Sequence, residues 1–186
     1  MEDVIRLKLE RINRTNKTLY FSILAGMFTI LAVAVVFEYS DILQKAPLTD
    51  PYALYTFDRI LLFIVLFLLL MVIFIKRVFL LPKKLIASAI KSKAKINASD
   101  ISDLISGSDS SKNILAKAVN ILRRWYMVIW STANLVMLLA FTGFILTGNF
   151  KIFLVYSAVS LYSSAINFPV FTMLEKCYYI SNDAVE

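Results

Sequence analysis

The stretch from Ile60 to Ile75 reads ILLFIVLFLLLMVIFI and contains no polar side chain. A helix needs about 20 apolar residues to cross the roughly 30 Å hydrocarbon core of a bilayer. With the residues just before it, this stretch predicts a membrane-spanning helix over Phe57–Ile75. Three further apolar runs of similar length predict spans at about Thr18–Phe37, Trp125–Thr147 and Ile152–Leu174.

The composition of the 186-residue chain also indicates a membrane protein. Hydrophobic residues make up 59% of the sequence, whereas roughly 45–50% is usual for soluble domains. The alternating pattern of a transmembrane β-barrel is absent, so the spans are predicted to be helices, which satisfy their own backbone hydrogen bonds in lipid. The sequence therefore predicts an all-α fold, an integral membrane four-helix bundle that forms a single domain over residues 1–186.

Basic residues gather on one side of the predicted spans. Seventeen of the 20 Lys and Arg residues lie before the first span, in the loop over residues 76–124, or after the fourth span. Basic residues near span ends stay in the cytoplasm, so both termini and this loop are predicted to be cytoplasmic. The charge bias and the absence of cysteine pairs favour a bacterial inner (plasma) membrane. Only three basic residues remain for the opposite side: Lys45, Arg59 and Lys151.

Two amphipathic helices are predicted in the cytoplasmic loop 76–124. The second is expected to continue without a break into the third span, because nothing before Gly143 interrupts it. Three arrangements of the pair are open: on the membrane surface, against each other beneath the bundle, or bound to a partner. The apolar faces comprise Leu85, Ile86, Ala89, Ile90 and Ala94 in the first helix, and Ile114, Leu115, Ala118, Val119 and Leu122 in the second.

The N-terminal residues 1–17 carry a shorter apolar stripe. Ile5, Leu9 and Ile12 fall at helical spacing among Arg and Lys residues. This pattern fits an interfacial helix leading into the first span, and it fits a frayed basic tail equally well.

Reactive side chains are scarce. The chain has no histidine and a single cysteine, Cys177, which excludes haem ligation by His, a His-bearing zinc site, an iron–sulfur cluster and an intramolecular disulfide within it. No ionisable residue lies deep in a predicted span, where such residues usually mark ion or proton pathways. We therefore expect no catalytic residue, no metal and no cofactor. Cys177 is expected to be a reduced, inert thiol, with palmitoylation as the alternative in a eukaryotic source.

Small and polar residues within the spans are the remaining candidates for function. Small residues let membrane helices approach closely, and hydroxyls and amides hydrogen-bond across the contact. The alternative is that the polar face lines a hydrated pathway or a headgroup pocket. Because the third and fourth spans are antiparallel, Asn134 and Asn167 are predicted to lie at similar depth. The candidates are Ser22 and Gly26 in the first span, Ser131 and Asn134 in the third, and Ser157, Ser160, Ser164 and Asn167 on one face of the fourth.

Three short motifs in the last 60 or so residues resemble a group of small, uncharacterised four-span bacterial membrane proteins. They are Ile121-Leu122-Arg123-Arg124, Leu146-Thr147-Gly148-Asn149 and Asn167-Phe168-Pro169. In that group an Arg precedes a span with an acidic residue, a Leu-Thr-Gly-Asn turn follows, and an Arg-Pro pair lies in the last span. This chain has Thr132-Ala133-Asn134 at the acidic position and Asn167-Phe168-Pro169 at the Arg-Pro position. The resemblance implies fold and topology, and it carries over no activity.

These observations predict a non-enzymatic membrane protein that acts as a structural or accessory subunit. Its expected partners are the lipid bilayer with its anionic headgroups, and either other membrane subunits or further copies of itself. The net charge of +7 flanks the spans, so nucleic acid is not an expected partner. The alternative is a small oligomeric channel or transporter that uses the Ser/Asn face. An enzyme acting on lipids is disfavoured because the inner acidic residues match no motif: Asp100, Asp103, Asp109 and Glu175.

Overall fold

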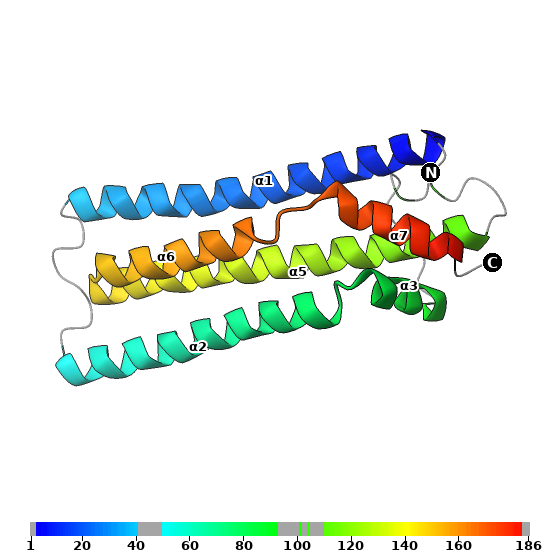
Figure 1. The fold of residues 1–186 in the computed structure, drawn as a ribbon. Coiled ribbons are helices and arrows are strands. Elements are labelled where there is room, and N and C mark those ends of the chain that lie inside the picture. Colours follow the sequence, from blue (N-terminus) through cyan, green and yellow to red (C-terminus); the bar gives the residue numbers. More distant parts are fainter. Residues whose placement is uncertain (1–2, 41–49, 93–100, 102–103, 105–109, 184–186) are drawn as a thin grey trace. The chain divides into compact units, whose positions relative to one another are not determined.

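A computed structural model describes residues 3–40, 50–92, 101, 104 and 110–183 (Figure 1). These residues form helices and no strands, which confirms the all-α prediction. Predictions that involve the other residues, such as the placement of Ala94 on an apolar face, lie outside the described residues. The helices are α1 (Asp3–Tyr39), α2 (Pro51–Val78), α3 (Pro82–Lys91), α5 (Ser110–Thr147), α6 (Phe150–Ala165) and α7 (Phe171–Asp183).

Three of these helices are long and apolar enough to cross a membrane, which makes the chain compatible with an integral membrane protein. They are α1, α2 and α5, and each contains one of the first three predicted spans. The helix α5 runs without a break from Ser110 to Thr147, as predicted for the second loop helix and the third span. The helix α6 is apolar but shorter, with 16 residues.

The fourth predicted span differs from the structure. The sequence predicts one span over Ile152–Leu174, whereas α6 ends at Ala165 and α7 begins only at Phe171. The physical cause is Pro169, which has no N–H to donate and whose ring clashes with the carbonyl four residues earlier in a helix. The residue before a proline also disfavours helical geometry. The backbone hydrogen bonds of α6 accordingly stop at Asn167, whose N–H donates to the Ser164 carbonyl.

The chain divides into two compact units, each built from segments that are distant in the sequence. Unit 1 comprises Met1–Tyr20, Phe74–Val128 and Phe168–Glu186, and unit 2 comprises Phe21–Ile73 and Ile129–Asn167. The long helices α1, α2 and α5 each contribute residues to both units. Unit 2 contains most of the apolar length of the three candidate spans, and unit 1 contains most of the amphipathic segments.

Unit 2 has an aliphatic and aromatic interior. Seven buried residues from α1, α5 and α6 form its larger cluster. A smaller cluster joins Leu61 and Val65 of α2 to Val136 of α5. A tight turn at Gly148 and Asn149 connects α5 to α6, and Gly148 has the positive φ of 68° that favours glycine. The larger cluster consists of Met27, Ala34, Ala133, Met137, Ala140, Phe144 and Phe153.

Unit 1 buries the amphipathic faces seen in the sequence. The stripe of Ile5, Leu9 and Ile12 is buried, and these residues are part of the continuous helix α1. The helix α3 packs against α7. On α3 the buried residues are Leu85, Ile86 and Ala89, whereas Ile90 is exposed although its spacing predicted it on the same face. On α5 the buried residues of this unit are Leu115, Ala116, Ala118, Val119, Leu122 and Tyr126.

Candidate functional site

The polar face predicted on the fourth span is buried in unit 2. Its four predicted members lie on α6 and at its C-terminal end, and each exposes at most 3% of its surface. Ser163, which the sequence places beside them, is buried as well. We refer to Ser157, Ser160, Ser163, Ser164 and Asn167 together as the polar stripe.

One hydroxyl of the polar stripe bonds across to the facing helix. The Ser160 hydroxyl donates a hydrogen bond of 2.5 Å to the backbone carbonyl of Ala133 on α5. A serine side chain is small enough for the two backbones to approach closely at this point, and its hydroxyl adds a hydrogen bond where the surroundings are apolar. Ser160 therefore acts in helix packing within the chain.

The C-terminal end of α6 is satisfied by two further hydrogen bonds. The Asn167 side-chain amide donates to the Ser163 carbonyl at 2.7 Å, and the Trp130 indole N–H donates to the Asn167 carbonyl at 3.0 Å. A helix that ends in an apolar environment leaves carbonyl groups without partners, and each such group is costly there. Together these side chains stabilise the break that Pro169 imposes.

Sequence reasoning missed Trp130. The residue is fully buried, and its indole N–H makes the contact described above. The signal was available, because Trp usually lies at span ends, whereas Trp130 lies several residues inside the third predicted span. A Trp at such a position needs an acceptor for its N–H, which points to an interrupted backbone nearby.

The predicted match in depth between Asn134 and Asn167 is wrong. Asn167 contacts Trp130, and Ser160 contacts Ala133, the residue next to Asn134. Asn134 follows Trp130 by about one helical turn, so it lies roughly 6 Å further along the α5 axis. Because α5 and α6 are antiparallel, Asn134 is level with the middle of the polar stripe.

Three buried oxygen atoms of unit 2 have no hydrogen-bond partner among the described residues. They are the side-chain oxygens of Asn134, Ser157 and Asn167. A buried polar atom without a partner is costly, and such atoms commonly mark bound water or another ligand. Chemically, each of these oxygens suits a hydrogen bond from a water or another neutral polar group.

The other candidate residues lie outside this set. Ser131 of α5 is exposed, as are Ser22 and Gly26 of α1. A Cβ atom added at Gly26 would meet no atom within 4 Å. The small-xxx-small pair of α1 therefore lies on an exposed face of that helix. The pair Ser160 and Ser164 of α6, by contrast, is buried within unit 2.

Unit 1 holds the single cysteine. Cys177 of α7 is fully buried, and this burial raises the pKa of its thiol to about 12. Because the thiolate is the reactive form, the thiol is unreactive near neutral pH. Among the residues that the structure describes, no three His, Cys, Asp or Glu side chains come together as a metal site.

Comparisons of the chain with models of protein families, with curated proteins and with solved structures find no match.

Proposed function

We propose that this chain is a non-enzymatic polytopic membrane protein that acts as a structural or accessory subunit, by self-association or with other membrane subunits. The observation that carries the proposal is the use of the polar stripe. Within it, Ser160 bonds to α5 and Asn167 bonds to the end of α6 itself, so these two polar residues of unit 2 serve helix packing. Large apolar side chains cover much of the surface that unit 2 leaves exposed, which suits lipid or other membrane helices.

The exposed surface of α2 supports a role in contact with lipid or other subunits. Within unit 2 its buried residues form a narrow stripe, Leu61, Val65 and Val72, which repeats at helical spacing. Large apolar side chains cover the rest of the helix. A helix that is apolar all round needs lipid or other apolar protein on its outer faces. The exposed residues include Ile60, Leu62, Phe63, Ile64, Leu66, Phe67, Leu70 and Ile73.

We propose four membrane crossings, with α6 and the residues after it as the fourth. The 16 residues of α6 span about 24 Å, somewhat less than the roughly 30 Å hydrocarbon core. The satisfied carbonyls at its end are compatible with an end inside the membrane. The strong bias of Lys and Arg favours both termini and unit 1 on the cytoplasmic side of a bacterial inner membrane.

Purification of the tagged protein in mild detergent tests the proposal directly. The native mass of the particle and mass spectrometry of co-eluting proteins are the two measurements. We expect either a homo-oligomer or a reproducible set of other membrane subunits. A monomer that elutes without companions, from membranes solubilised under several mild conditions, would refute the subunit role.

For self-association, the open face of α1 is the position to alter. We expect Gly26→Leu to shift the particle to a lower native mass, because the larger side chain prevents close approach of a second α1. The monomer tolerates the change, since the position is open. Ala32→Leu, also exposed on α1 but on another face, is the matched control and keeps the original mass. An unchanged mass for Gly26→Leu would exclude this face from the contact.

A small channel or transporter is the second candidate. The observation that favours it is the group of buried oxygens without partners at Asn134, Ser157 and Asn167. If these atoms contact a transported solute, then reconstituted liposomes show solute flux, and Asn134→Leu abolishes the flux. Ser131→Leu is the control, because Ser131 is exposed on the same helix. The absence of flux across a panel of ions and small solutes would leave the subunit role as the better explanation.

A further inference from the structure

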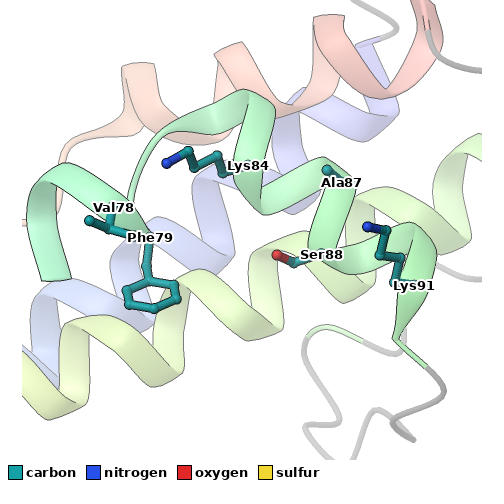
Figure 2. Close-up of a pocket in the computed structure, with 6 residues that line it drawn as sticks. All are labelled: Val78, Phe79, Lys84, Ala87, Ser88 and Lys91. Atoms are coloured by element: carbon teal, nitrogen blue, oxygen red, sulfur yellow. The ribbon is translucent and has the colours of Figure 1, made fainter.

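A cavity of about 210 Å³ lies in unit 1, where α3 follows the end of α2. Figure 2 shows its lining, with Val78 and Phe79 on one side and three α3 residues with polar ends across from them. Among the described residues that line it, the charged groups are the amino groups of two lysines. The lining residues are Val78, Phe79, Lys84, Ala87, Ser88 and Lys91.

The polar groups of the cavity come from one face of α3. Lys84, Ser88 and Lys91 are spaced by four and three residues, which places them along one side of the helix. The opposite side of α3 packs into the interior of unit 1 through Leu85, Ile86 and Ala89. The packing therefore directs the two amino groups and the hydroxyl outward to the cavity. Among the described residues, neither lysine forms an ion pair.

The cavity lies beside the end of an apolar membrane-spanning stretch. Val78 follows the last residue of the apolar run, Ile75, by one turn of α2. Phe79 stacks on Trp125, with ring centroids 4.4 Å apart and an angle of 19° between the planes. Aromatic residues of this kind are enriched where a membrane meets water. Leu81, two residues after Phe79 in the chain, is 48% exposed and adds an apolar side chain to the surface near the end of α2.

We propose that this cavity binds a phosphate group, and that the group is the headgroup phosphate of an anionic phospholipid. Lys84 and Lys91 supply positive charge and Ser88 supplies a hydroxyl donor, which together match a phosphate. Val78, Phe79 and Leu81 supply an apolar surface for the first part of the acyl chains. A soluble phosphate compound shares the headgroup chemistry but makes no use of that apolar surface.

The test uses the full-length protein in neutral detergent, with phosphatidylglycerol as the probe and phosphatidylcholine as the neutral lipid. Native mass spectrometry measures the dissociation constant for bound lipid. We expect Lys84→Gln/Lys91→Gln to weaken phosphatidylglycerol binding about 10- to 30-fold. The matched control is Lys83→Gln/Lys176→Gln, which removes the same charge from positions of α3 and α7 outside the cavity and leaves binding nearly unchanged.

A second arm titrates inorganic phosphate at constant ionic strength. One outcome is that phosphate binding depends on Lys84 and Lys91, whereas phosphatidylglycerol binding does not depend on them. The cavity is then a phosphate site, but its ligand is a soluble phosphate compound and not a lipid. Equal effects of the two double variants on both probes would overturn the site, because general surface charge would then explain the binding. The lipid assignment rests on the proposed membrane placement of α2, but these measurements do not depend on oligomeric state. The two proposals therefore fail separately.

Discussion

Replacing Leu9 by Ala is expected to lower the free energy of unfolding of unit 1 by about 2–5 kcal/mol. Leu9 exposes none of its surface, and it lies on the stripe that α1 directs into the interior of this unit. Removing its side chain leaves a cavity among buried neighbours and loses their contacts. Hydrogen exchange followed by mass spectrometry measures the change, as faster exchange in peptides of unit 1.

The neighbouring Leu7 provides a matched control for this prediction. It has the same side chain on the same helix, but 66% of its surface is exposed. Leu7→Ala is therefore expected to change the free energy of unfolding by less than about 0.5 kcal/mol. If both substitutions have small and equal effects, the N-terminal segment is a frayed tail. That result would contradict the structure, in which this segment is a packed part of α1.

Replacing Gly143 by Leu is expected to destabilise unit 2 by about 1–3 kcal/mol or more. A Cβ atom at this position would lie 2.9 Å from the Leu61 Cδ2 atom and 3.6 Å from the Phe57 Cε1 atom, both on α2. Leucine has a higher helix propensity than glycine, so the intrinsic effect on α5 has the opposite sign. A lower Tm in detergent would therefore report the contact between α5 and α2.

A second substitution separates overpacking from other causes. Leu61→Ala removes the side chain that the new leucine would meet, so Gly143→Leu/Leu61→Ala should recover part of the lost Tm. Such recovery is the coupling expected of two residues in contact. Gly26→Leu is the control for the glycine change itself, because that position is open, and it should leave the monomer's Tm unchanged or raise it slightly. A higher Tm for Gly143→Leu would contradict the packing of α2 on α5.

Much of the helical architecture follows from local patterns in the sequence. The apolar runs locate α1, α2 and α5, because length and composition decide whether a helix suits the hydrocarbon core. The spacing of Leu115, Ala118 and Val119 correctly placed them on a buried face. Two local signals compete at Pro169, and there the sequence predicted one span where the structure has two helices. There the apolar composition continues to Leu174, but the backbone cannot remain helical.

The candidate site shows the same division. Its helical spacing placed Ser157, Ser160, Ser164 and Asn167 on one face, and all four are buried together. The spacing did not reveal which atoms they meet, since Ser160 bonds to a backbone carbonyl of α5 and Asn167 to the Trp130 indole. Partners of this kind depend on how far one helix is shifted along another, and no single helix carries that information.

By itself, the sequence determined that this protein is helical and which faces of its amphipathic segments are apolar. Among the four spans that it predicted, it also located the three helices that are long and apolar enough for a bilayer. These properties are sums over neighbouring residues, so they can be read locally. Only the tertiary structure decided that the N-terminal stripe, α3 and α7 fold into a compact unit, and that Lys84 and Lys91 line a cavity beside Phe79. Those outcomes join residues that are distant in the chain, and their free energy comes from burying faces against one another.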